Sequence, residues 1–141
     1  MRILGLDYGR KRIGVAVCDE LGMTAQGLAV IERKNKKKDL EALLHFINIY
    51  GVEKVVMGYP LKLDGRPGPQ CEEVDRFILC LQPKLSIPII RWDETLSTKD
   101  AEEILRTANV KAKKRKAVVD KIAAGMILQR YLDSLIKNET V

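Results

Sequence analysis

The first third of the chain carries short apolar runs separated by short polar connections, a pattern that is typical of β-strands. The runs lie over Arg2–Asp7, Ile13–Cys18 and Gln26–Glu32. The connections between them are too short for the crossover of a dozen or more residues that parallel neighbours need. The pattern therefore predicts three strands in an antiparallel meander.

The pattern then changes to a helical period. From Leu40 to Ile47, apolar residues follow the i, i+3, i+4, i+7 spacing of one helix face, and Gly51 ends this helix as a C-terminal glycine does. Ser97 and Asp100 form an S-x-x-D capping box, which predicts the start of a later helix. The other predicted elements are a strand over Glu53–Gly58, a helix around 74–81, a strand over Ser86–Trp92 and a last helix over about 117–137.

The order of these elements predicts an α/β protein. Each strand–helix–strand crossover implies parallel pairing with a right-handed turn. A mixed five-stranded sheet results, three antiparallel strands followed by two parallel ones, with helices on both faces. This is the ribonuclease H-like (RNase H-like) architecture, although periodicity alone leaves it one candidate among several α/β folds. The length of 141 residues corresponds to one domain, expected over 1–137 with a C-terminal tail over 138–141.

Composition narrows the class of protein. Apolar residues make up 46% and charged residues 31%, as in globular proteins, and no apolar run approaches the ~20 residues that span a bilayer. The N-terminal segment lacks the apolar centre of a signal peptide, so a cytoplasmic protein without a membrane anchor is expected. Three cysteines form no paired framework, and the single histidine, His45, lies within a predicted helix. Zinc sites and nucleophilic triads are therefore disfavoured, and any chemistry is expected to use carboxylates.

The charge balance favours a polyanionic partner. There are 25 Lys and Arg residues against 19 Asp and Glu residues, a net charge of +6. Clustered basic residues attract phosphates and release counterions, so they predict nucleic-acid binding. The second of three clusters, taken alone, is equally typical of a solvated surface. The clusters are Arg10, Lys11 and Arg12; Arg33, Lys34, Lys36, Lys37 and Lys38; and Lys111, Lys113, Lys114, Arg115 and Lys116.

Carboxylates stand at three places where a site could form. Asp7 ends the first strand, and Glu94 follows Asp93 at the end of the last one. Asp120 lies in the last helix, ahead of small residues that would allow a close approach to the sheet. Each has an ordinary explanation, as a turn former, a helix N-terminal charge or a solvent-facing spacer. Ligands of open α/β sheets gather at the carboxyl ends of strands, however, so we expect the three to meet there.

The predicted sheet gives these carboxylates a spacing that suits metal ions. If the strand over Glu53–Gly58 lies between the two acidic strands, their backbones are about 9.6 Å apart. Two metal ions ~3.5–4 Å apart with their oxygen ligands span a gap of that order. Gly58 is expected to leave the centre open. Oxygen ligands without histidine favour Mg²⁺ or Mn²⁺, which predicts phosphodiester hydrolysis.

The motifs over 6–16, 58–65, 93–98 and 120–128 resemble those of the YqgF family in order and spacing. Members of that family are described as Holliday junction resolvases with a RuvC-type fold and as nucleases that mature the 5′ end of precursor 16S rRNA. The resemblance covers nearly the whole chain. It implies an RNase H-like nuclease whose substrate is an rRNA precursor or branched DNA.

The same resemblance implies the roles of the acidic residues. Asp7, Glu94 and Asp120 would be the catalytic, metal-binding carboxylates, with Asp93 in reserve. The family often has arginine after the Asp-Glu pair, where this chain has Thr95. The phosphate contact of that arginine is then missing or is supplied by Arg91.

Three further expectations complete the picture. The first and third basic clusters would contact nucleic acid, and the chain would be a monomer or a weak homodimer. The loop over 61–69 is either a flap over the substrate or a surface loop. An ATP-binding protein of the actin-like superfamily would need two such domains, which the length excludes, whereas a non-catalytic nucleic-acid-binding module in transcription or ribosome assembly stays open.

Overall fold

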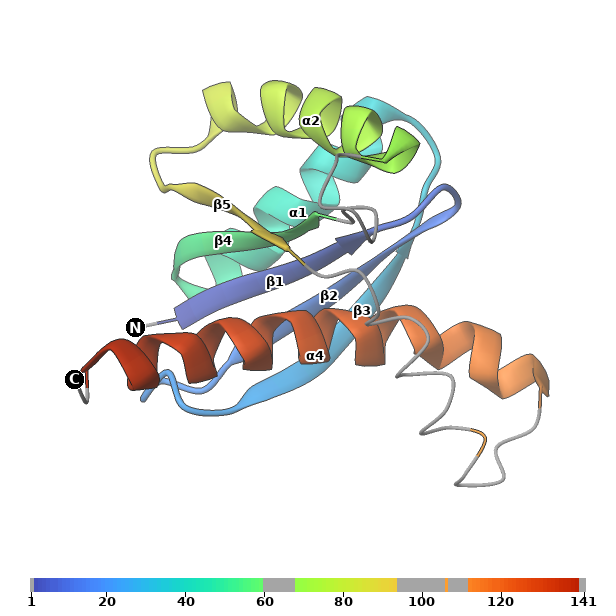
Figure 1. The fold of residues 1–141 in the computed structure, drawn as a ribbon. Coiled ribbons are helices and arrows are strands. Elements are labelled where there is room, and N and C mark those ends of the chain that lie inside the picture. Colours follow the sequence, from blue (N-terminus) through green and yellow to red (C-terminus); the bar gives the residue numbers. More distant parts are fainter. Residues whose placement is uncertain (1, 60–67, 94–105, 107–111, 140–141) are drawn as a thin grey trace.

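The chain folds into one mixed sheet between two layers of helices (Figure 1). The computed structural model describes residues 2–59, 68–93, 106 and 112–139, and of 112–117 and 137–139 it describes the backbone only. The elements are β1 (Arg2–Tyr8), β2 (Arg12–Cys18), β3 (Ala25–Glu32), α1 (Lys36–Tyr50), β4 (Val52–Tyr59), α2 (Pro69–Leu81), the short 3₁₀ helix η1 (Gln82–Lys84), β5 (Ile89–Asp93) and α4 (Ala112–Glu139).

The sheet has the predicted topology. Its strand order is β3-β2-β1-β4-β5. The pairs β1–β2 and β2–β3 are antiparallel, and β1–β4 and β4–β5 are parallel. The strand β4 therefore lies between β1 and β5, as the spacing of the acidic strands requires, and the RNase H-like fold is confirmed.

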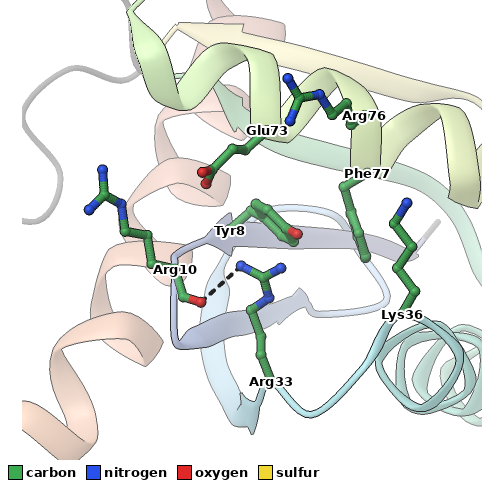
Figure 2. A pocket seen from close by; sticks show the side chains of 7 residues that line it. All are labelled: Tyr8, Arg10, Arg33, Lys36, Glu73, Arg76 and Phe77. Carbon is green, nitrogen blue, oxygen red and sulfur yellow. Dashed lines mark hydrogen bonds between the residues drawn. The ribbon is translucent and has the colours of Figure 1, made fainter.

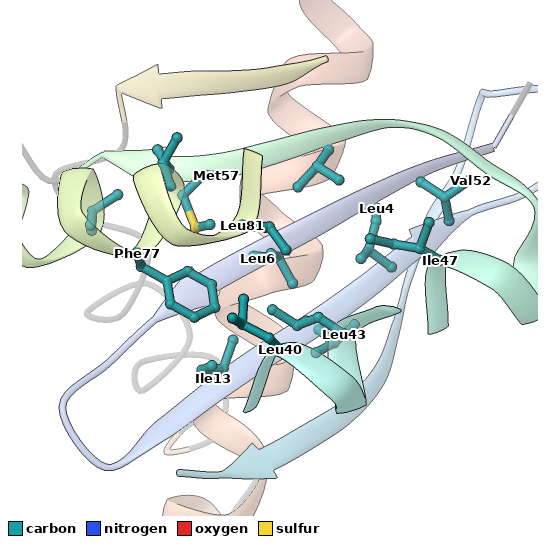
Figure 3. Close-up of a cluster of buried hydrophobic side chains, with 14 of the residues drawn as sticks. Leu4, Leu6, Ile13, Leu40, Leu43, Ile47, Val52, Met57, Phe77 and Leu81 are labelled. Carbon is teal, nitrogen blue, oxygen red and sulfur yellow. The ribbon is translucent and has the colours of Figure 1, made fainter. Parts of the chain in front are cut away.

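The two faces of the sheet carry separate cores. Figure 1 shows α1 and α2 on one face and α4 along the other. Along β1, Leu4 and Leu6 point to α1 and α2, whereas Ile3 points to α4, as the alternation of a strand requires. Figure 3 shows the larger core, in which the side chains of β1, β2 and β4 meet those of α1 and α2. Residues next to each other at the end of β1 thus reach opposite faces.

The helix α1 begins and ends as its sequence predicts. The backbone N–H of Lys38 donates to the Asn35 side chain at 2.9 Å, which caps the first turn. At the other end Gly51 adopts a left-handed conformation with φ of 59°. His45 lies exposed on this helix. Among the described residues no helix is long and apolar enough to cross a membrane.

Two element boundaries differ from the sequence prediction. The strand β5 begins at Ile89 and not at Ser86, because Pro88 has no N–H to donate to the ladder, although its carbonyl accepts from Val55 at 3.0 Å. The helix α4 begins at Ala112 and not near 117. Its first turn consists of strong helix formers without an apolar face, so periodicity could not detect it. The helix predicted from Ser97 lies outside the described residues.

Glycines let α4 lie close against the sheet. A Cβ atom placed at Gly5, Gly14 or Gly27 would collide with the helix. Gly58 of β4 makes the same close approach, because its Cβ position is only 2.6 Å from Cδ1 of Ile127. The expectation that Gly58 leaves the centre of the site open is therefore wrong. The space beside it is filled by a side chain of α4.

Candidate active site

Asp7 and Asp120 approach each other at the end of β1. Asp7 is the second-last residue of β1, on the α4 face, because its neighbours Leu6 and Tyr8 belong to the opposite core. Its partner across the antiparallel pair is Gly14. The backbone of Asp120 lies directly over Gly14, where any side chain would collide with the Asp120 carbonyl. The glycine thus brings the helix-borne carboxylate beside the strand-borne one.

The electrostatics of Asp7 reflect this juxtaposition. Burial, and then the nearby Asp120 carboxylate, raise the pKa of Asp7 to about 7. Burial in low dielectric and a like charge both disfavour the ionised form. At neutral pH, Asp7 therefore exchanges a proton readily, and a cation placed here would favour its release.

Arg12 is the fixed partner of Asp120. Its Nε donates to Oδ2 of Asp120 at 2.8 Å, and the two side chains are 32% and 19% exposed. The same hydrogen bond raises the pKa of Arg12. The expected contact of Arg12 with nucleic acid stays a prediction, and in this structure Arg12 orients the Asp120 carboxylate. Because residues i and i+2 of a strand share a face, the position of Gly14 against α4 places Arg12 there as well.

The other predicted residues divide between the far face and the segments outside the described residues. Arg91 donates to Asp75 of α2 at 2.8 Å, whereas Trp92 packs edge-on against Tyr131 of α4 at 5.4 Å. By alternation, Asp93 lies on the α2 face with Arg91, exposed and away from Asp7. Outside the described residues lie Glu94, Thr95, Lys111, residues 61–67 of the predicted loop over 61–69, and the side chains of Lys113, Lys114, Arg115 and Lys116. The last two residues of that loop, Gly68 and Pro69, are the N-cap and the first residue of α2.

The described carboxylates suit a divalent cation in part. Asp7 and Asp120 offer hard oxygen ligands, the kind that Mg²⁺ and Mn²⁺ take. The two carboxylates repel each other, and the positive charge of such an ion would offset this repulsion. Within the described ranges no group of three Asp, Glu, His or Cys side chains is placed to hold a metal ion. A third ligand would therefore come from a residue outside them, and Glu94 is the sequence's candidate.

The cysteines take no part in this site. Cys18 and Cys71 are buried and Cys80 is half-buried, and none of the three forms a disulfide bond. This agrees with the absence of a paired cysteine framework in the sequence, and the buried thiols pack as small apolar groups.

Comparisons with known proteins place the chain in a family. A family model described as RuvX, Holliday junction resolvase, matches residues 1–134. A relative from Syntrophus aciditrophicus, named "Putative pre-16S rRNA nuclease", is 58% identical over 96% of this chain and 90% of its own length. A relative of the same name from Halothermothrix orenii is 53% identical over 94% of this chain and 95% of its own length.

Solved structures agree on the fold. T. thermophilus RuvC in complex with a Holliday junction substrate superposes with a TM-score of 0.59 at 14% identity, covering 96% of both chains. The Fowlpox virus resolvase bound to Holliday junction DNA gives a TM-score of 0.57 at 16% identity, covering 96% of this chain and 99% of its own. At these identities the likeness shows the fold alone. Together with the family match, it confirms the resemblance noted from the motifs: the chain belongs to the YqgF family of nucleases, which the family model names RuvX.

Proposed function

We propose that the chain is a metal-dependent nuclease that hydrolyses phosphodiester bonds of precursor 16S rRNA at its 5′ end. The observation that carries the proposal is the pair of carboxylates, Asp7 and Asp120, brought together over Gly14 with the pKa of Asp7 raised to about 7. Relatives at 53–58% identity are named for pre-16S rRNA, which favours RNA. Branched DNA is the second candidate, because the family model is described as a Holliday junction resolvase.

Each residue of the site has a distinct part in this proposal. Asp7 and Asp120, with Glu94, would hold Mg²⁺ or Mn²⁺. When bound, the metal supplies a lowered pKa for the attacking water and stabilises the charge that develops on the phosphate. In the metal-free protein the pKa of Asp7 is raised to about 7, so a metal ion competes with a proton for this carboxylate and should bind more tightly as the pH rises. Arg12 keeps the Asp120 carboxylate in one orientation.

Basic residues on both sides of the carboxylates would hold the substrate. Arg10 and Lys11 are exposed in the connection between β1 and β2, next to Asp7. The basic block over 111–116 reaches into the first turn of α4, ahead of Asp120. Phosphate contacts of this kind position a strand without reading its sequence. The choice between RNA and DNA must therefore be tested with substrates.

The test is cleavage by the purified protein with Mg²⁺ or Mn²⁺. The substrates are a pre-16S rRNA fragment with an unprocessed 5′ end and a four-way DNA junction. Asp7→Asn, Glu94→Gln and Asp120→Asn should each lower the rate by about 100-fold or more, because each removes a proposed metal ligand. Asp93→Asn is the matched control, since it removes an exposed carboxylate at the same sheet edge but on the other face, and it should cleave as the wild type does.

Other outcomes would identify the alternatives. If the wild type binds both substrates but cuts neither, and Asp7→Asn changes nothing, the chain is a nucleic-acid-binding module in transcription or ribosome assembly. If only the junction is cut, branched DNA is the substrate. A resolvase that acts on a two-fold junction pairs two active sites, so sedimentation with and without junction DNA tests the proposed monomer or weak homodimer.

A further inference from the structure

A basic pocket lies on the face of the sheet opposite to Asp7 and Asp120. Its volume is about 330 Å³, within the range of small-ligand sites. Figure 2 shows that its walls come from β1, from the connection between β1 and β2, from the connection between β3 and α1, and from α1 and α2. The lining residues are Tyr8, Arg10, Arg33, Lys36, Glu73, Arg76 and Phe77.

The charge of this pocket favours an anion. Four cationic side chains face one carboxylate, Glu73, which leaves a local charge of +3. Lys36 is also the first residue of α1, and the N-terminal amides of a 15-residue helix add positive potential. Among the described residues Arg76 pairs with Glu72, at 3.8 Å and with both side chains more than 70% exposed, so this pair contributes little energy. Lys36 and Arg76 can therefore turn to a ligand at small cost.

Arg33 gives the pocket a rigid cationic wall. Its Nη1 donates to the carbonyls of Gly9 and Arg10, each at 2.9 Å (Figure 2 draws the second). Its guanidinium carbon lies 4.5 Å from the centre of the Tyr8 ring. Its Nε is buried without a hydrogen-bond partner among the described residues, and Oδ2 of Asp39 is 3.8 Å away. An anion in the pocket would meet a cation that is already ordered.

The aromatic residues argue for a phosphate rather than a base. The Tyr8 ring is stacked on Phe77 with centroids 4.5 Å apart, and it also carries the Arg33 guanidinium. Its faces are therefore already in contact with neighbours. Burial raises the pKa of Tyr8, so its hydroxyl remains protonated and can donate to a phosphate oxygen.

The position of the pocket relates it to the active site. Tyr8 follows Asp7 directly in β1, and their side chains leave opposite faces of the sheet. A strand held at Asp7 can pass over the end of β1 and the exposed Arg10 to reach the other face. We propose that this pocket binds a backbone phosphate of the nucleic-acid strand next to the bond that is cut. The assignment rests on the proposed nuclease function for its substrate.

The test measures binding without cleavage. A fluorescent 12-nucleotide single-stranded RNA is titrated with the protein in EDTA at several salt concentrations. The double substitution Lys36→Ala with Arg76→Ala should weaken binding about tenfold and reduce the slope of log affinity against log salt by about 0.7 to 1.4, the value for one or two lost phosphate contacts. The matched control is Lys38→Ala with Lys84→Ala, which removes the same charge from two exposed lysines outside the pocket.

A second substitution protects the test from a folding artefact. Glu73→Gln removes the one carboxylate among the described residues that line the pocket, so it should tighten RNA binding about threefold, which a damaged fold would not do. Glu41→Gln, on the exposed side of α1, is its control and should change affinity less than Glu73→Gln does. If both pocket variants behave as their controls do, the pocket is not a strand contact and the proposal is overturned.

The remaining arms separate the source of the phosphate and the two proposals. Inorganic phosphate is added at about 1 mM, on the order of its concentration in cells, with the ionic strength held constant, and it should not displace the RNA. Displacement would identify a free anion as the ligand and would overturn the assignment to a nucleic-acid strand. Cleavage is measured separately with Mn²⁺. If the protein cleaves but the pocket variants bind RNA as their controls do, the pocket proposal alone is rejected. If the pocket variants change RNA binding as expected but the protein cleaves no substrate, the nuclease function alone is rejected.

Discussion

Single residues set the chemistry of the site through their partners. Asp120 has a cation, Arg12, within 2.8 Å, whereas Asp7 has burial and a like charge. The two carboxylates therefore have different surroundings, although they lie side by side. Arg12 holds the Asp120 carboxylate in one orientation, whereas burial and the nearby Asp120 charge raise the pKa of Asp7, which keeps its proton until a cation or a higher pH removes it.

The raised pKa of Asp7 has a measurable effect on stability. Folding raises this pKa from 3.8 to about 7, so the folded chain binds more protons than the unfolded chain between these values. The contribution is fully favourable below the unfolded pKa and is lost as the pH rises through about 7. In EDTA at pH 8, the free energy of unfolding of Asp7→Asn should therefore be about 1–3 kcal/mol higher than that of the wild type. At pH 5 the difference between the two should be smaller.

Urea denaturation at the two pH values measures this difference. Asp93→Asn serves as the control for removing a negative charge at the same sheet edge. A gain in stability that is equal at pH 5 and pH 8 would show that Asp7 titrates in the folded chain as it does in the unfolded one. A stabilised but inactive variant would instead be the expected trade between stability and function.

Of the three carboxylates that the sequence predicted to meet, Asp7 and Asp120 approach each other and Glu94 lies outside the described residues. The sequence did not predict how the two are partnered. Asp7 and Asp120 were singled out by their places at the end of a strand and above small helix residues, and the structure brings them together. Arg12 was grouped with its basic neighbours because a charge run does not say which side chain turns inward. Only the register of β1 with β2, and the helix above them, give it a carboxylate partner.

At the scale of elements, the packing of α4 on the sheet positions the site. Gly5, Gly14, Gly27 and Gly58 lie on four adjacent strands and all face this helix. Without side chains there, the helix backbone can approach the strands, and Asp120 is carried to the end of β1. The function of these glycines is therefore to allow close packing of the helix on the sheet, and not to form turns.

Two Gly→Ala substitutions test whether this close packing positions α4. At Gly14 the added methyl would overlap the Asp120 carbonyl, so Gly14→Ala should lower the free energy of unfolding by about 3 kcal/mol or more and lower cleavage as well. At Gly125, within α4, a methyl would find its nearest neighbour, the Gly27 backbone nitrogen, at 3.7 Å. Gly125→Ala should therefore be neutral or stabilise by up to about 1 kcal/mol through helix propensity.

The comparison of the two variants shows whether the space between α4 and the sheet determines stability. Both add one methyl group between α4 and the sheet region, so they differ mainly in the space available. Equal stabilities in chemical denaturation would mean that the helix shifts freely, and that its close approach does not position Asp120.

Element boundaries show where sequence patterns lose their information. The strands and α1 were predictable because burial imposes a period on them and Gly51 marks an end. The start of α4 was missed because exposed basic residues have no period, and the start of β5 because Pro88 breaks a run that looks continuous. Gly58 was misread because a glycine in a strand does not say whether it leaves space or admits a neighbour.

On the scale of the whole molecule, the sheet separates two charged regions. The carboxylates lie beneath α4, and the basic pocket lies between β1, α1 and α2. They meet only at the end of β1, where Asp7 and Tyr8 are neighbours. The basic cluster over 33–38, taken alone, could not be distinguished from a solvated surface in the sequence, because Arg76 of α2 and the rings of Tyr8 and Phe77 join it only in the fold.

This separation predicts that the two regions act independently on binding. Lys36 and Arg76 share no described contact with Asp120, and the sheet lies between them. Effects of distant substitutions without shared partners add within about 0.3–0.5 kcal/mol. The loss of RNA affinity caused by Lys36→Ala with Arg76→Ala should therefore be the same, within about twofold, in the wild type and in an Asp120→Asn background.

A double-mutant cycle of RNA binding in EDTA measures this coupling. Arg12→Ala combined with Asp120→Asn is the matched positive control, because these two residues share an ion pair and their effects should not add. A coupling above about 1 kcal/mol between the pocket and Asp120 would mean that binding on one face rearranges the other. The strand would then not simply pass over the end of β1, because the sheet itself would have to change its structure between the free and the bound protein.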